Sequence, residues 1–135
     1  MQPTDILFFN KYFFTDDRTS EGVNHFALLL LPRIASGYEN NIYCAVITSK
    51  KPWSKYNLAL KKENHKCFKK DMSYVCFDRR DFQCIDDLGK KKPVGQLNKQ
   101  ECKVGFKLLK SALSIDSSTS TLLKGAMIRE WQKIL

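Results

Sequence analysis

The spacing of apolar residues changes once along this chain, near residue 98, and no other feature limits the possible fold as much. Before this point, apolar residues form short runs, such as residues 26–31 and 42–48, bounded by turn residues such as Pro32 and Asn41. Such runs are typical of β-strands. After it, apolar residues recur every three or four positions, as in amphipathic helices. The sequence therefore predicts an α+β protein with its strands first and its helices last.

Six segments in the first part have the composition of strands. Because they are short and closely spaced, they predict a small barrel or a compact sandwich. A chain of 135 residues suits a single domain, and no internal repeat divides it. The predicted strands cover residues 6–9, 26–31, 42–48, 56–60, 74–77 and 82–85.

Two helices are expected after the barrel, which should span residues 5–97. Asn98 is suited to cap the first helix, and Glu101, three residues later, gives a relative of the capping box. The first helix is predicted over residues 98–114 and the second over residues 120–134. Their apolar stripes, which indicate core or interface positions, are Cys102, Phe106, Leu109 and Leu113 in the first, and Leu123, Met127, Trp131 and Ile134 in the second.

Positive charge is concentrated in the middle of the chain. The formal net charge is +9, and residues 50–110 contain seventeen basic and seven acidic residues. A concentrated cationic surface binds polyanions by releasing their condensed counterions. The pattern favours a nucleic-acid partner, and the alternative is a lysine-rich face that only keeps the protein soluble.

Several classes of protein are not indicated. No apolar run approaches the roughly 18 residues of a membrane span, and the start, Met1-Gln2-Pro3, lacks the basic region of a signal peptide. A cytoplasmic location without membrane association is therefore expected. His65 and Cys67 have the spacing of metal ligands, but no second pair accompanies them, so neither a metal nor another cofactor is expected. The five cysteines, none in a CxxC pair, predict reduced thiols: Cys44, Cys67, Cys76, Cys84 and Cys102.

Short motifs in a fixed order add a more specific indication. The motifs are DILFF at 5–9, HFALLL at 25–30, IYCAVITS at 42–49, SYVCFD at 73–78, ID at 85–86 and VGQL at 94–97. In order and spacing they resemble the PemK/MazF family of bacterial toxin endoribonucleases. The likeness covers roughly residues 5–113 and leaves the last helix outside.

The resemblance implies an SH3-like antiparallel β-barrel with a C-terminal helix. It implies metal-independent cleavage of single-stranded RNA, in which the ribose 2′-hydroxyl attacks the adjacent phosphate and leaves a 2′,3′-cyclic phosphate. It also implies a homodimer that holds RNA in its groove, and an acidic antitoxin that occupies the same groove. Trp131 and the last helix could extend the dimer interface.

Four residues match positions that carry function in the family. Thr48 and Ser49 match a Thr-Ser pair whose hydroxyls could donate to phosphate, although hydroxyls at strand ends also form simple caps. Asp78 matches an acidic position that acts as the base in some members, or it pairs with a neighbouring arginine. Glu21 matches an acidic residue of the first loop, or it is a solvated loop charge.

Two family arginines are replaced here. His25 stands where the family has the arginine before its proline, and Cys76 stands two residues before the matched aspartate. Neither side chain reproduces the bidentate grip of a guanidinium on phosphate. A histidine can give or take a proton near neutral pH, so His25 is a candidate catalytic residue, the alternative being a structural role. Arg79 and Arg80 could supply the missing charge, or they form salt bridges to Asp78 and Asp81.

The segment after Ser49 combines cations with an aromatic ring. Lys50, Lys51, Trp53 and Lys55 suit single-stranded RNA, because cations follow the backbone while rings stack on bases. The alternative is a solvated loop with one ring in the core. Two rivals to the nuclease hypothesis follow from the missing arginines: a non-catalytic RNA-binding module, and a module that binds an acidic protein.

Overall fold

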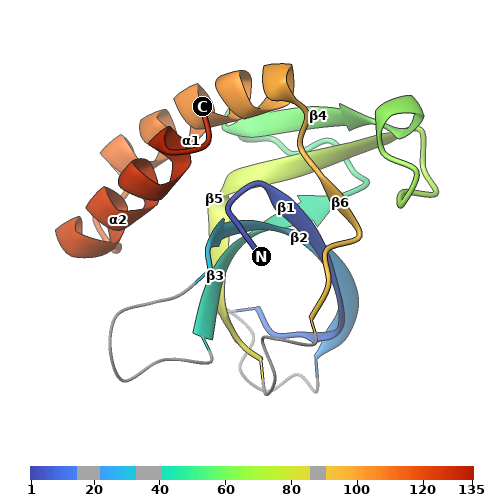
Figure 1. The fold of residues 1–135 in the computed structure, drawn as a ribbon, viewed down its shortest axis with the longest axis horizontal. Coiled ribbons are helices and arrows are strands. Elements are labelled where there is room, and N and C mark those ends of the chain that lie inside the picture. Colours follow the sequence, from blue (N-terminus) through green and yellow to red (C-terminus); the bar gives the residue numbers. More distant parts are fainter. Residues whose placement is uncertain (15–21, 33–40, 86–90) are drawn as a thin grey trace.

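A computed structural model describes residues 1–14, 22–32, 41–85 and 91–135 (Figure 1). Within these residues, six strands form one antiparallel sheet in the order β4-β5-β3-β2-β1-β6, and the sheet curls into a half-barrel. Two helices follow, which confirms the α+β class. The elements are β1 (Asp5–Tyr12), β2 (Val23–Leu31), β3 (Asn41–Thr48), β4 (Asn57–Lys61), the short 3-10 helix η1 (Lys62–Asn64), β5 (Met72–Cys84), β6 (Gly95–Gln96), α1 (Lys99–Ile115) and α2 (Thr121–Gln132).

The curled sheet has an apolar cluster on each face. Alternation along β2 sends Leu28 and Leu30 to the face that α1 and α2 cover, and Ala27 and Leu29 to the concave interior. Both faces of the central strands are therefore buried. This is why β2 and β3 have nearly continuous apolar sequences rather than the alternation of a half-exposed strand.

Strand β5 differs from the sequence-based prediction of two strands at 74–77 and 82–85. It is one strand of 13 residues, Met72–Cys84, that pairs with both β3 and β4. Its register to β3 shifts between the pairs Val46↔Cys76 and Ala45↔Arg80, so residues 77–79 form a bulge. A bulge bends a strand, and here it lets β5 turn the corner of the curled sheet.

Helix α1 begins as its sequence predicts. The side chain of Asn98 accepts a hydrogen bond from the Glu101 N–H at 2.9 Å, and Glu101 accepts one from the Asn98 N–H at 2.8 Å. These two bonds form a complete capping box. The predicted stripe of Cys102, Phe106, Leu109 and Leu113 is buried against the sheet.

Helix α2 packs against its own domain. Trp131 is fully buried, stacked on Phe106 of α1 with ring centroids 6.3 Å apart and edge-on to Phe77 of β5 at 6.1 Å. Gly105 of α1 faces the Trp131 ring, and an added Cβ would lie at ordinary contact distance, 3.6 Å, from that ring. The idea that Trp131 extends a dimer interface is therefore wrong, because the ring is already buried within one chain.

The cysteines are free thiols, as predicted, and Cys44, Cys76 and Cys102 are buried. The other two are more accessible, since Cys84 is exposed and Cys67 is partly exposed. Neither helix in the described part of the chain is long and apolar enough to cross a membrane.

One ion pair joins the β5 bulge to the connector between the helices. Arg80 donates to the Asp116 carboxylate, to the Thr119 hydroxyl at 3.2 Å and to the Phe77 carbonyl, and its side chain is 5% exposed. Hydrogen bonds from Thr119 and Ser118, together with the charge of Arg80, hold the pKa of Asp116 well below its usual range. The folded state thus favours the ionised carboxylate.

We expect Asp116→Asn to lower the free energy of unfolding by about 2–3 kcal/mol at pH 7, because it leaves a buried guanidinium without its counter-charge. The pKa of Asp116 is lower in the folded than in the unfolded chain, so its contribution is complete at neutral pH and fades as the pH falls below about 4. Urea titrations at several pH values should show the two proteins converging in acid. Glu130→Gln, which removes the exposed pair with Lys133, is the control with an expected change of about 0.5 kcal/mol or less. If the difference in free energy of unfolding between Asp116→Asn and the wild-type protein stayed constant with pH, the stabilising role of the Asp116 carboxylate would be contradicted.

Candidate functional site

A pocket of about 600 Å³ opens where β2 and β3 meet the loop before β5. His25, Thr48 and Ser49, which the sequence singled out from two separate strands, all line it. Its size is sufficient for a nucleotide-sized group. The other lining residues are Phe8, Asn24, Phe26, Ile47, Cys67, Phe68, Lys69, Lys70, Ser73 and Val94.

Strand register brings the first of these residues together. Phe26 of β2 pairs with Ile47 of β3, and continuing that register by one residue places His25 beside Thr48. On its other side His25 pairs with Phe9 of β1. The pocket therefore lies at the start of β2 and the end of β3, beside paired strands of the sheet.

The His25 ring is held in a defined orientation. Its Nδ1 lies 2.7 Å from the Phe26 carbonyl oxygen, and because a carbonyl can only accept, Nδ1 carries the proton. Tyr12 and Phe14 contact the ring with centroids 5.7 and 5.4 Å away. In the neutral ring, Nε2 then holds a free lone pair and can accept a proton.

Residues with hydroxyl and ammonium groups line the same pocket as His25. Thr48 Oγ1 accepts a hydrogen bond from the Lys50 N–H at 3.3 Å, which leaves its own proton free to be donated elsewhere. Ser49, Lys69 and Lys70 are exposed to solvent. No carboxylate is among the described lining residues, so the pocket attracts anions.

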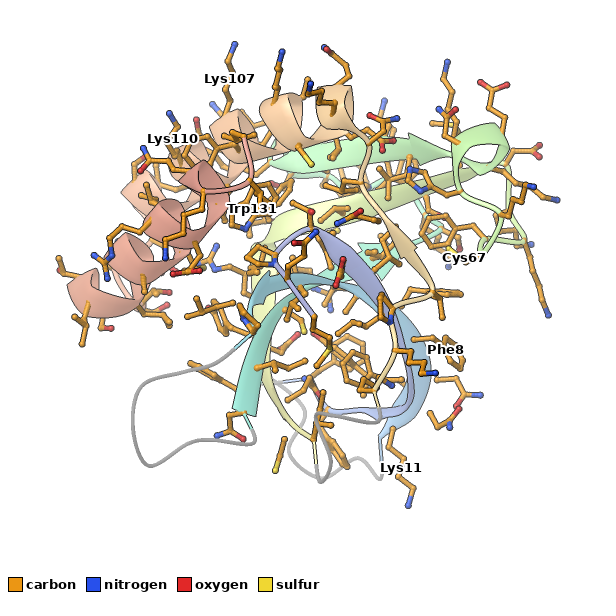
Figure 2. The ribbon with its side chains drawn as sticks, viewed as in Figure 1. Phe8, Lys11, Cys67, Lys107, Lys110 and Trp131 are labelled. Carbon is orange, nitrogen blue, oxygen red and sulfur yellow. The ribbon has the colours of Figure 1, made fainter. Side chains whose placement is uncertain are left out.

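Aromatic rings form one wall, and the sequence predicted only strand positions for Phe8 and Phe26. The ring centroids of Phe8 and Phe26 are 5.0 Å apart, and those of Phe26 and Phe68 are also 5.0 Å apart. Phe8 and Phe26 are partly exposed, so part of this aromatic wall is accessible to a ligand. Figure 2 shows Phe8 and Cys67, both lining residues, on the side of the molecule away from α2.

A buried pair anchors the loop that carries Phe68, Lys69 and Lys70. His65 Nε2 lies 2.8 and 2.9 Å from the two carboxylate oxygens of Glu101, and both residues are buried. Since Glu101 also caps α1, the loop is tied to the start of that helix. His65 thus has a structural partner, and no group of three or more metal-ligating side chains occurs among the described residues.

Asp78 lies outside this pocket. It is an exposed residue of the β5 bulge and lines a separate hollow of about 260 Å³ with Arg80 and Asp116. It is four residues beyond Tyr74, the partner of Thr48, and at about 3.3 Å per residue that is roughly 13 Å of strand. Within one protomer, Asp78 therefore lies apart from His25 and Thr48, with which the sequence-based prediction grouped it.

The two arginines near Asp78 are occupied differently. Arg80 is committed to Asp116 rather than to Asp78 or Asp81, which argues against its predicted contact with RNA. Arg79 is exposed, with its guanidinium 5.6 Å from the Phe14 ring. Cys76 is buried, and burial together with the nearby Asp78 charge raises the pKa of its thiol to about 11, so it is neutral and supplies no charge.

The loop after Ser49 displays the cations and ring that the sequence predicted for RNA. Trp53 is fully exposed, whereas Tyr56 at the end of the same segment is partly buried against the core, so the alternative of a solvated loop with one ring in the core stays open. Lys50, Lys51 and Lys55 are exposed, and the Lys55 ammonium lies 5.4 Å from the Tyr56 ring. Glu21, the predicted first-loop acid, lies outside the described residues.

Comparison with solved structures finds toxins with this architecture. The Mycobacterium tuberculosis toxin MazF-mt6 matches with a TM-score of 0.56 at 16% identity, over 85% of this chain and 99% of that chain. A mycobacterial endoribonuclease in complex with its cognate antitoxin matches with a TM-score of 0.57 at 12% identity, over 86% and 97%. No family model and no curated protein sequence matches. This chain therefore has the MazF/PemK-like toxin fold.

Proposed function

We propose that this protein is an endoribonuclease that cleaves single-stranded RNA in the His25 pocket. The observation that carries the proposal is that His25, Thr48 and Ser49 line one pocket with Lys69 and Lys70, and that no carboxylate is among its described lining residues. The two solved structures described above are a toxin and an endoribonuclease by their descriptions, which supports the same activity here.

In the proposed reaction, His25 Nε2 removes the proton from a ribose 2′-hydroxyl. The 2′-oxygen attacks the adjacent phosphorus, the bond to the 5′-oxygen breaks, and a 2′,3′-cyclic phosphate forms. Thr48 and Ser49 donate hydrogen bonds to the developing charge on phosphate. The ammonium of Lys69 or Lys70 is the proton donor for the leaving oxygen. The reaction requires the 2′-hydroxyl, so DNA is not a substrate, and no step requires a metal ion.

The aromatic groups around the pocket suit unpaired bases. The wall of Phe8 and Phe26 can stack a base beside the reacting phosphate, and the exposed Trp53 can stack another. A tryptophan that remains fully in solvent forgoes a large apolar contact, which favours a role in binding. The lysines at 50, 51 and 55 then follow the RNA backbone.

The proposal includes partners. The solved endoribonuclease that this chain resembles is bound to its cognate antitoxin, which supports an acidic antitoxin for this protein as well. We propose that such an antitoxin covers the basic pocket, that the active form is a homodimer, and that it acts on RNA in the cytoplasm.

A second candidate function is RNA binding without cleavage. Cys76 favours it, because a buried neutral thiol stands where the family has a phosphate-binding arginine. The same basic surface could also bind an acidic protein.

Cleavage of RNA in the presence of EDTA tests the proposed function. Purified protein is incubated with a mixed-sequence single-stranded RNA and with the matching DNA. We expect cleavage of the RNA alone, with 2′,3′-cyclic phosphate ends. Binding without cleavage at every protein concentration would favour the non-catalytic module instead.

A further inference from the structure

Helix α1 carries a row of lysines on the face turned away from the sheet. Lys99, Lys103, Lys107 and Lys110 are all exposed. At 3.6 residues per turn they lie within about 80° of one another around the helix axis, so they form one stripe, here called the lysine ridge. Figure 2 shows Lys107 and Lys110 projecting outward from α1. None of the four lines the His25 pocket.

No negative charge of the helix balances this ridge. The only acidic residue of α1 is Glu101, which is buried and occupied by His65 and the Asn98 N–H. Within the described part of the chain, no ion pair involves any of the four lysines. The ridge is therefore a stripe of uncompensated positive charge along the helix.

This arrangement acts against the stability of the helix. Lysines four residues apart repel one another, as Lys99, Lys103 and Lys107 must. Lys99 occupies the first turn, where the helix dipole favours negative charge, and the last turn has no basic residue. A charge pattern that lowers the local stability of a helix indicates a function that requires those charges.

The chemistry of the ridge suits a phosphodiester backbone. A step of four residues advances about 6 Å along the helix, so the ammonium groups repeat at regular intervals, as the charges of a nucleic-acid strand do. Protein partners usually need a buried apolar anchor, and in α1, all of which the structure describes, the exposed large apolar side chains are Val104 near the ridge and Ile115 at the last residue. We propose that the lysine ridge is a second RNA-binding surface that contacts phosphates outside the pocket without regard to base sequence.

A segment with exposed lysines, and with the exposed acid Glu63 between them, lies in sequence between β4 and the pocket loop. Lys62 and Lys66 are exposed in the segment between β4 and the pocket loop, and His65 in that segment contacts Glu101 at the start of α1. An RNA longer than the pocket can therefore extend along this segment onto α1. The proposal concerns binding and does not depend on cleavage.

RNA affinity measured over a range of salt concentrations tests the ridge. The probes are a hexanucleotide and a 30-nucleotide mixed-sequence single-stranded RNA, both with 2′-O-methyl groups to prevent cleavage. For the double variant Lys103→Gln/Lys107→Gln, we expect the negative slope of log affinity against log salt to become less steep by about 1.4 with the long RNA. At 0.1 M salt its affinity should fall at least tenfold. Affinity for the hexanucleotide should not change.

The matched control is Lys11→Gln/Lys133→Gln, which removes the same charge from exposed positions outside the ridge. Figure 2 shows Lys11 at the opposite end of the molecule from α1. Equal losses for both double variants would overturn the proposal, because a general effect of net charge would explain them. Unchanged affinity of the ridge variant for the long RNA would also overturn it. Poly-glutamate serves as a further probe, and a variant that loses only poly-glutamate binding would assign the ridge to an acidic protein. A protein that binds long RNA through the ridge but cuts none would refute only the nuclease proposal.

Discussion

His25→Ala should lower the rate of RNA cleavage by about 10²- to 10⁴-fold, the usual contribution of a positioned acid–base group. His25 is the only histidine among the described residues that line the pocket, and its Nδ1 bond to the Phe26 carbonyl leaves Nε2 as the proton acceptor. The measurement is single-turnover cleavage of a fluorescent RNA in EDTA from pH 5 to 9. If His25 is the base, the variant also loses the acidic limb of the wild-type pH–rate profile.

Two further variants separate this role from structural ones. Asp78→Asn should leave the rate within about threefold, because Asp78 lies in a different hollow. Asn10→Ala, at an exposed position of β1, controls for general effects of substitution in these strands. Added imidazole should restore part of the His25→Ala activity, since the ring leaves a space that free imidazole can enter. A fast His25→Ala enzyme together with an inactive Asp78→Asn would transfer the role of base to Asp78.

The strands and helices were predictable where the signal is local. The capping box of Asn98 and Glu101 spans four residues, and the helical stripes repeat within one turn, so each could be recognised in sequence. The continuity of β5 could not. Its middle holds Asp78, Arg79, Arg80 and Asp81, a charged run that looks like a loop. The strand continues across this run because residues distant in sequence pair with its charged side chains. Asp116 forms an ion pair with Arg80, and the Tyr12 hydroxyl donates a hydrogen bond to Asp81 at 2.7 Å.

The site was predictable only in part, for a related reason. His25, Thr48 and Ser49 were recognised singly by resemblance. Their proximity depends on the pairing register between β2 and β3, which no local sequence pattern reveals. Phe8 and Phe26 of the aromatic wall were predicted only as strand residues, since apolar residues at a pocket rim and in a core have the same pattern. The loop carrying Phe68 is placed by the His65–Glu101 pair across 36 residues of sequence, which no local pattern reveals.

Trp131→Ala should lower the free energy of unfolding by about 3–5 kcal/mol, the largest effect on stability expected for this chain. The ring fills the space between α1, α2 and β5, where it contacts Phe106 and Phe77, and its loss leaves a cavity beside Gly105. Figure 2 shows Trp131 between the helices and the sheet. Equilibrium unfolding in urea measures the change. Leu122→Ala, in the same helix but 74% exposed, is the control and should cost about 0.5 kcal/mol or less.

Two further measurements distinguish a core role for Trp131 from a role between subunits. A core ring stabilises each chain by itself, so the loss in Trp131→Ala should be the same at low and high protein concentration, whereas an interface role would make it vary with concentration. Trp131→Phe tests the packing more finely. The indole Nε1 has no hydrogen-bond partner among the described residues, so phenylalanine removes a buried unpaired donor while it keeps an aromatic ring. Its cost should therefore be less than half that of alanine, and an equal cost would mean that the indole N–H has a partner that stabilises the fold.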